Sequence, residues 1–144
     1  MGLIEVLVAV LVLSIGFLGM AALQAMSLST NNGAMARSMA TIDSYSIFDA
    51  MRADLNNAVA GAYNKTVVVS ACPASGSTLA SVQLNHWCTQ LENDHMGSNT
   101  QGTIDCTAAT GTSTAYCTVT IKFDESYSGS SGGSTQTVVT KAML

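Results

Sequence analysis

The sequence predicts an α+β fold: a long N-terminal α-helix, transmembrane in its first half, packed on a small globular domain with a short helix and a three- to four-stranded antiparallel sheet. Three observations predict it. Residues 1–26 are apolar almost throughout, residues 28–59 repeat apolar side chains at helical spacing, and the last third has three stretches rich in Thr, Val and Ile. We expect residues 1–28 to be the transmembrane and assembly half of the helix, residues 29–62 its amphipathic half, and residues 63–144 the globular head.

The N-terminal segment has the length and polarity of a membrane span. About 20 apolar residues suffice for a helix to cross the hydrocarbon core of a bilayer, and after Glu5 no charged residue occurs until Arg37. A carboxylate inside such a helix costs roughly 2.5–3.5 kcal/mol on insertion scales, so Glu5 is a candidate functional residue. Gly16 and Gly19 lie one turn apart. Either they merely permit close packing, or a neighbouring helix crosses there.

The start of the sequence lacks the basic region of a secretory signal peptide. Either the apolar segment is an unusual insertion signal, or Met1 is a mature N-terminus whose basic leader has been removed. In the second case the α-amine of Met1 and the positive end of the helix lie beside the Glu5 carboxylate, of the same chain or of a neighbour. An amine–carboxylate pair in a low-dielectric bundle is more favourable than either charge alone, so Met1 and Glu5 are the candidate assembly residues.

The helix is predicted to continue to about residue 62, with one apolar stripe covered by the head and the charged side chains on its other faces. Asn31 to Gly33 is the one weak point, where the helix either bends or loosens or else stays continuous, and Gly61 and Asn64 are its stop signals. The predicted stripe consists of Leu28, Met35, Met39, Ile42, Tyr45, Phe48, Met51, Leu55 and Val59. The charged residues predicted to face away from it are Arg37, Asp43, Asp49, Arg52 and Asp54.

The head is predicted to begin with a connecting loop over residues 64–77, in which residues 66–70 add a short strand. Residues 78–95 form a second helix, capped by Ser77 or Thr78, and its apolar face consists of Leu84, Trp87, Cys88 and Leu91. The three predicted strands cover residues 103–108, 115–123 and 135–143. The Gly/Ser-rich segment 128–134 joins the last two strands and is expected to be mobile.

Four cysteines follow the apolar segment, which indicates two disulfides and an oxidising compartment. Four cysteines permit three pairings. Folding a hairpin about residues 111–112 places Cys106 opposite Cys117, which favours a cross-strand Cys106–Cys117 disulfide. Cys72–Cys88 then follows by elimination. The spacings contain no C-x-x-C pair, which argues against zinc.

Composition and motifs exclude several functions. A net charge of −4 with five basic residues argues against nucleic-acid binding through phosphate contacts. No Walker loop, G-x-S-x-G or H-E-x-x-H motif occurs, so we expect no enzyme activity, no cofactor and no metal. The polar cluster of the second helix is interpreted as exposed residues around a buried tryptophan rather than metal ligands: His86, Glu92, Asp94 and His95. Asp124 and Glu125 are interpreted as a solvated turn rather than a weak calcium site.

One family pattern covers the start of the chain. Residues 2–24, GLIEVLVAVLVLSIGFLGMAALQ, resemble the N-terminus of type IV pilins, and most closely that of PilV-type minor pilins, with the glutamate at the fifth mature residue. The later order is also similar: a long helix, Tyr-Asn after it, a helix with Leu84, Asn85 and Trp87, and strands that include TVTIKFDE. The resemblance implies the type IV pilin fold.

The resemblance also implies a function. A basic leader is removed by prepilin peptidase, and Met1 is then N-methylated. The protein waits in the bacterial inner membrane as a single-pass protein with its C-terminal domain in the periplasm, and then enters the pilus, at the tip. Its partners are other minor pilins and the major pilin, through the long helix, and a tip adhesin. Together the minor pilins prime pilus assembly, which serves twitching motility and cell adhesion.

The chain departs from the family pattern in three places. Met1 stands where phenylalanine is usual, Gly2 where threonine or serine is usual, and Ala22 where major pilins carry a helix-loosening proline. The last departure favours a minor over a major subunit. Four alternatives stay open: a minor pseudopilin of a type II secretion system, a major pilin, a DNA-uptake pilin, and, from another class, a single-span membrane-anchored periplasmic binding protein that never assembles.

Overall fold

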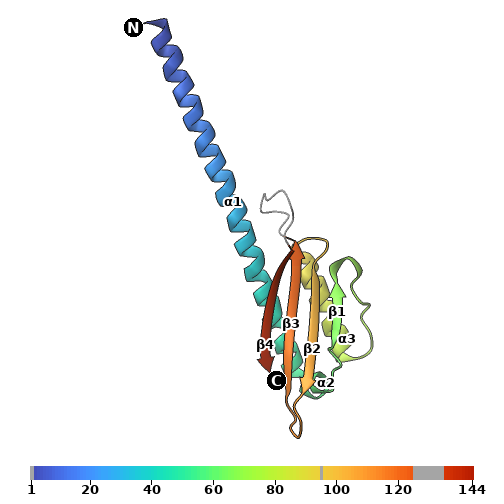
Figure 1. Cartoon of the computed structure of the whole chain (residues 1–144). Helices are drawn as coiled ribbons and strands as arrows, with labels where there is room; N and C mark the ends of the chain where they lie inside the picture. The colour runs from blue at the N-terminus through green and yellow to red at the C-terminus, as the bar shows by residue number, and fades with distance from the viewer. Residues whose placement is uncertain (1, 95, 125–134) are drawn as a thin grey trace.

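The computed structural model describes residues 2–94, 96–124 and 135–144. A single long helix, α1 (Leu3–Ala53), runs from the N-terminus into a small head, where its last third packs against a four-stranded antiparallel sheet and the short helix α3 (Leu79–Asn93) (Figure 1). The N-terminal part of α1 projects beyond the head, and within the described part of the chain its side chains are exposed. The predicted α+β fold is therefore confirmed.

The end of α1 corrects the prediction of one helix to residue 62. The helix passes through Asn31 to Gly33 and stops instead at Asp54, whose backbone leaves the helical region at φ −127° and ψ 47°. The Asp54 carboxylate accepts hydrogen bonds from Asn57 Nδ2 at 2.8 Å and from the Tyr63 hydroxyl at 3.0 Å. Aspartate side chains compete in this way with the helical backbone. The five-residue helix α2 (Leu55–Val59) follows, and Gly61, at φ 80°, ends it as predicted.

The face of α1 that meets the head differs from the predicted stripe. Phe48 and Met51 are buried as expected, but Ile42 and Tyr45 are 57% and 55% exposed and Asp43 is buried. The small residues Ala40 and Ser44 let α3 and the sheet approach that side of α1 closely, and they carry little hydrophobic signal in a sequence. The buried residues of α1 are Ala40, Asp43, Ser44, Ile47, Phe48 and Met51.

The sheet has the order β1-β2-β3-β4, and all neighbours are antiparallel. Its strands are β1 (Lys65–Val68), β2 (Gln101–Ala108), β3 (Ala115–Asp124) and β4 (Thr135–Met143), with the short 3-10 helix η1 (Val69–Ala71) after β1. The predicted alternation of β3 is confirmed, since its inward side chains are Cys117, Val119, Ile121 and Phe123. The prediction of a mobile segment 128–134 falls outside the described residues.

Helix α3 closes the core from the side opposite the sheet. Thr78 is its N-cap, with Oγ1 accepting the Ser81 N–H at 3.2 Å. Its predicted apolar face is buried and consists of Leu84, Trp87, Cys88 and Leu91. The core thus lies between one end of α1, one face of α3 and the inner face of the sheet.

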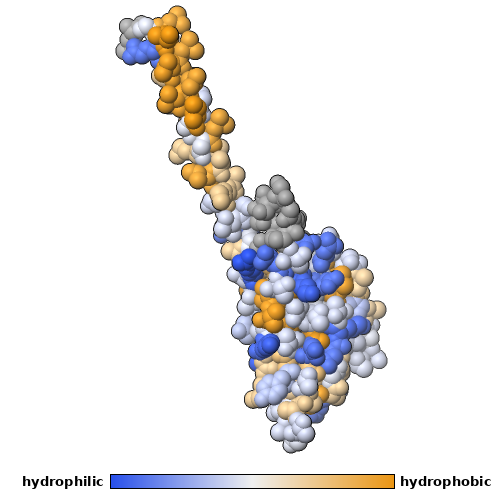
Figure 2. Space-filling model, viewed as in Figure 1, coloured by the Kyte–Doolittle hydropathy of each residue, from blue (hydrophilic) through white to orange (hydrophobic). Residues whose placement is uncertain are grey.

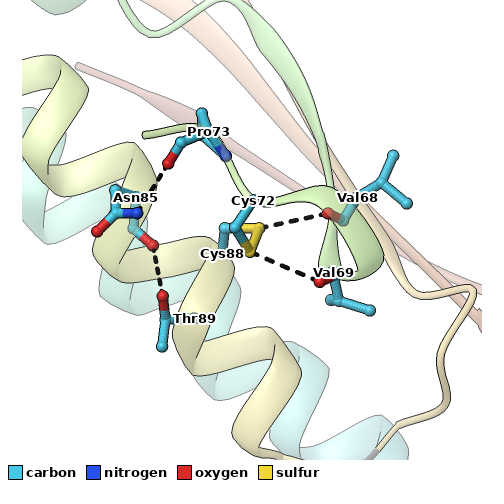
Figure 3. Close-up of a disulfide and its surroundings, with 7 residues drawn as sticks. All are labelled: Val68, Val69, Cys72, Pro73, Asn85, Cys88 and Thr89. Carbon is cyan, nitrogen blue, oxygen red and sulfur yellow. Dashed lines mark hydrogen bonds between the residues drawn. A yellow bond between two sulfur atoms is a disulfide. The ribbon is translucent and has the colours of Figure 1, made fainter. Parts of the chain in front are cut away.

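Two disulfides fasten the head, with the pairing that the hairpin register favoured. Cys106 and Cys117 are direct cross-strand neighbours with Cα atoms 4.0 Å apart. Cys72 and Cys88 join the segment after η1 to the middle of α3, with Cα atoms 5.6 Å apart (Figure 3). Asn85, one turn before Cys88, donates a 2.7 Å hydrogen bond to the carbonyl oxygen of Pro73 and fastens the same segment.

The side chain of Asn64 extends the sheet beyond the start of β1. Its Oδ1 accepts the backbone N–H of Cys106 at 2.8 Å, and its Nδ2 donates to the carbonyl oxygen of Cys106 at 2.9 Å. The amide thus replaces a strand residue as the partner of β2. The Asn64-Lys65-Thr66 sequence matches a glycosylation sequon, but the nitrogen that would carry the sugar is engaged in this pair.

Candidate assembly surface on the N-terminal helix

The projecting half of α1 is an uncovered apolar rod. Figure 2 shows it as an almost continuous hydrophobic surface that contrasts with the polar head. Among the described residues, α1 is the helix long and apolar enough to cross a membrane, and none of its most apolar stretch is buried. Exposed apolar patches of this size mark contacts with lipid or with other proteins. A lipid bilayer or the helices of other proteins would cover such a surface.

Glu5 lies in the first turn of this helix, where its carboxylate complements the positive end of the helix dipole. Its backbone N–H donates to the carbonyl oxygen of Gly2 at 3.0 Å, and Gly2 supplies no side-chain cap. Helix N-termini leave N–H groups without internal partners, so a carboxylate there is favoured. The predicted amine partner, Met1, lies outside the described residues.

Glu5 also opens a shallow groove that runs for about four turns along one side of α1. The groove is lined by Glu5, Val8, Ala9, Val12, Leu13, Gly16, Phe17 and Met20. A Cβ added at Gly16 would meet nothing within 4 Å, so the groove is empty at that position. Gly19 is equally open but does not line the groove. Of the two glycines singled out in the sequence, Gly16 therefore shares a surface with Glu5.

The groove can hold a second apolar helix. Small residues at an interface let two helix backbones approach closely, and Ala9 and Gly16 are two turns apart on the same side. A helix in this groove would gain van der Waals contact along its length. A cation on that helix would meet the Glu5 carboxylate at one end, which gives the contact a defined register.

Apolar side chains continue along α1 beyond the membrane-length segment on the side that the head leaves open. Leu28, Met35 and Ile42 follow one another at intervals of seven residues and are 66%, 59% and 57% exposed. Intervals of seven are typical of helix–helix packing. The prediction that the head covers these residues, as part of the apolar stripe, was therefore wrong. Their spacing fits a contact with the head and a contact with another helix equally well. Only the position of the head on α1 distinguishes these two possibilities.

No metal centre forms among the residues that the structure describes. His86 and Glu92 are exposed, and Asp94 ends α3. Asp124 accepts from Asn99 Nδ2 at 3.0 Å and from Thr135 Oγ1 at 3.2 Å. His95 and Glu125, the remaining candidates from the sequence, fall outside the described residues.

One prediction for a polar group of the head was wrong: Asp43, expected on a face of the helix that points away from the head, is fully buried. The sequence did contain a signal for this burial, because Ala40, Ser44 and Ile47 recur at helical spacing and lie on the same buried side of the helix as Asp43. Because that face contains small and polar residues, a search for large apolar side chains at helical spacing does not find it.

Comparisons with protein-family models, with curated proteins and with solved structures found no match to this chain. A proposal for its function therefore depends on the residues and surfaces described above.

Proposed function

We propose that the chain is a minor pilin of the type IV pilus, part of a tip complex with other minor pilins that primes pilus assembly and helps to display a tip adhesin. One observation carries the proposal: the single carboxylate of the apolar helix, Glu5, lies at one end of an open groove that a second helix can fill. The same helix continues without interruption into a disulfide-fastened head. The N-terminal sequence resemblance supports the same function.

The apolar half of α1 has two environments in this proposal. Before assembly it spans the bacterial inner membrane, where Glu5 is unfavourable by roughly 2.5–3.5 kcal/mol on insertion scales. In the pilus the helix lies among the helices of other subunits, and an amine from a neighbouring N-terminus, or Met1 of the same chain, is next to Glu5. The gain of that ion pair, together with apolar contact in the groove, favours transfer from lipid to filament.

The head and its disulfides fit an extracytoplasmic position. Disulfides persist in oxidising compartments such as the periplasm. The proposed topology is a single membrane pass with the head in the periplasm, followed by incorporation at the pilus tip. The exposed residues Leu28, Met35 and Ile42 extend the helix contacts with other minor pilins and the major pilin along the base of the head.

Mass spectrometry of the N-terminus of the protein purified from its native membrane tests this proposal. We expect a chain that begins at Met1 with a methylated α-amine, because prepilin processing produces that group and membrane insertion alone does not. A purified protein whose Met1 carries no methyl group would contradict the proposal.

A minor pseudopilin of a type II secretion system would use the same groove and the same carboxylate. Deletion of the gene discriminates between the two functions. Loss of surface pili and twitching motility with normal protein secretion supports the pilus, whereas loss of secretion with normal pili supports the pseudopilin.

A membrane-anchored periplasmic binding protein that never assembles is the candidate from another class, and the apolar helix by itself fits it. In that case the Glu5 carboxylate has no partner helix. Crosslinking with a photoreactive residue at position 9 or 16 of the groove separates the two. Crosslinks to other pilin-like helices support assembly, and crosslinks to lipid alone in piliated cells support the anchor.

A further inference from the structure

A fully buried carboxyl lies where α1 meets α3. The backbone carbonyl oxygen of Asp43 accepts a 3.0 Å hydrogen bond from Trp87 Nε1, and its Oδ1 accepts a 2.7 Å hydrogen bond from Gln90 Nε2. Ser46, one turn further along α1, donates to Gln90 Oε1 at 3.3 Å, which orients the Gln90 amide with its NH2 group toward Asp43. Three polar contacts therefore join the same two helices around Asp43.

The second carboxylate oxygen, Asp43 Oδ2, has no hydrogen-bond donor within reach among the described residues. The neighbouring group is another carboxyl, that of Asp94, the residue that ends α3. Two carboxylates offer only acceptors, so a hydrogen bond between them requires that one carries a proton. Burial first, then the hydrogen bond to Asp94 and its charge, raise the pKa of Asp43 to about 7, while the bond from Gln90 acts in the opposite direction.

We propose that the buried Asp43 carboxyl, whose Oδ2 has no donor among the described residues, shares one proton with Asp94, and that loss of this proton separates the C-terminal end of α3 from α1. With the proton present, an O–H···O hydrogen bond joins the helices. Without it, two negative charges repel each other, and the fully buried Asp43 has no donor for Oδ2 in the described part of the chain. The pair is therefore a pH-sensitive contact inside the head, and it is independent of the proposed assembly function.

Among the residues that the structure describes, the elements around the pair supply no cation to offset the second charge; His95, which follows Asp94 in the sequence, lies outside them. Lys122 and Lys141, on β3 and β4, are exposed on the outer face of the sheet, whereas α1 packs on its inner face. Arg37 donates at 2.9 Å to Gln136 of β4. On α3, Glu92 is exposed. Asp94 is the charged group that shifts the pKa of Asp43.

Trp87 gives a direct measurement, because it is the only tryptophan in the chain and its indole N–H is bonded to Asp43. Tryptophan fluorescence of the full-length protein in detergent is recorded from about pH 5 to about pH 9, the range in which Asp43 is expected to titrate. We expect the emission to change with a midpoint near pH 7 and the change to be absent in Asp43→Asn. Asp94→Asn removes the repulsion and is expected to move the midpoint to lower pH by about one unit or more.

Matched variants exclude other groups that titrate in this range. Glu92→Gln changes an exposed carboxyl of the same helix and should leave the transition unchanged. The chain has two histidines, and histidine titrates in the same range, so the double variant His86→Asn/His95→Asn must also retain the transition.

The proposal is overturned by a flat wild-type titration, by a transition that persists in Asp43→Asn, or by one that disappears in the double histidine variant. If Asp43→Asn fails to fold, as judged by circular dichroism, Asp94→Asn decides the question. An unshifted midpoint in that variant contradicts the shared proton. Infrared spectroscopy adds a second measurement, since the band of a neutral carboxylic acid is expected below the transition and not above it.

Discussion

The ring of Trp87 lies against the backbone of Gly102, so closely that a Cβ at position 102 would stand 2.3 Å from Cη2 and 2.8 Å from Cζ3 of the indole. Leu91 Cδ1 would be 3.0 Å away. Helix α3 can therefore rest on β2 only because this position has no side chain. Gly102 is paired with Ile121 in the sheet, so the strand cannot move away without breaking its ladder.

Gly102→Ala is therefore expected to lower the free energy of unfolding by about 1–3 kcal/mol, the usual effect of overpacking a rigid core. Thermal unfolding of the full-length protein in detergent, followed by circular dichroism, measures it. Gln101→Ala, at the adjacent exposed position of β2, is the control and should have little effect. Equal melting temperatures for Gly102→Ala and wild type would show that Trp87 has room to move.

Asn64→Ala removes both hydrogen bonds to the backbone of Cys106, so the N–H and carbonyl groups of Cys106 lose these partners. We expect a loss of about 1–3 kcal/mol, because unpaired backbone groups are costly. Asn64→Asp keeps the acceptor for the Cys106 N–H but puts a carboxylate oxygen opposite the carbonyl oxygen, so it should also destabilise at neutral pH. Amide hydrogen exchange at Cys106 measures directly how far its backbone N–H loses protection in Asn64→Ala. Unchanged protection in Asn64→Ala would contradict the assigned pair.

The stability of the head is expected to depend on pH through Asp43. Its pKa in the folded protein is raised from the ordinary value of 3.8 to about 7, so between these values the folded state holds a proton that the unfolded chain has lost. The contribution of Asp43 to stability is fully present below about pH 4, falls as the pH rises toward 7, and is lost above it.

The comparison of wild type with Asp43→Asn isolates this contribution, because asparagine cannot ionise. We expect the melting temperature of wild type, relative to Asp43→Asn, to fall by on the order of 5 °C between acidic and neutral pH. Asp49→Asn is the control, since Asp49 is exposed and forms its ion pair with Arg52 at 2.8 Å. A constant difference across the pH range would argue against titration of Asp43.

Glu5→Ala is expected to leave the protein stably inserted in the membrane but poorly incorporated into pili. Loss of an ion pair worth about 1.4 kcal/mol lowers incorporation on the order of tenfold. Immunoblots of sheared pili and of membranes measure the ratio of incorporated to membrane-inserted protein. Ser14→Ala is a control on the same helix, because the Ser14 hydroxyl bonds to its own helix at Val10 and does not line the groove. Wild-type levels of Glu5→Ala in pili would refute the assembly role.

Gly16→Leu fills the groove without changing charge. We expect it to reduce incorporation into pili, because a neighbouring helix can no longer approach closely at that point. Gly19→Leu introduces the same side chain one turn away and outside the groove, so it should have the smaller effect. The reverse order would place the partner helix on a different face of α1. Melting of the head should be unchanged in both variants, since neither residue contacts it.

The sequence predicted the elements of the head closely because its signals there are local. Thr78 begins α3, and the alternation from Cys117 to Phe123 marks the inner face of β3. Hairpin register predicted the Cys106–Cys117 disulfide, because a hairpin folded about residues 111–112 brings these two residues together, and Cys72–Cys88 followed by elimination. The break at Asp54 was not predictable in this way, since it depends on Tyr63, a residue nine positions later.

The sequence by itself determined that the chain has one apolar helix with a single carboxylate near its start, joined to a small disulfide-fastened head. These features could be predicted because the length of an apolar segment, the spacing of its apolar residues and the number of cysteines do not depend on how distant segments pack. Only the tertiary structure decided which side of that helix the head covers. Ile42 and Tyr45 have the hydrophobicity of core residues and Asp43 does not, yet Asp43 is buried, because Trp87 and Gln90 of α3 meet its carbonyl and carboxyl groups there. Burial of a polar group depends on hydrogen-bond partners from a distant segment, so the local sequence around the group does not predict it.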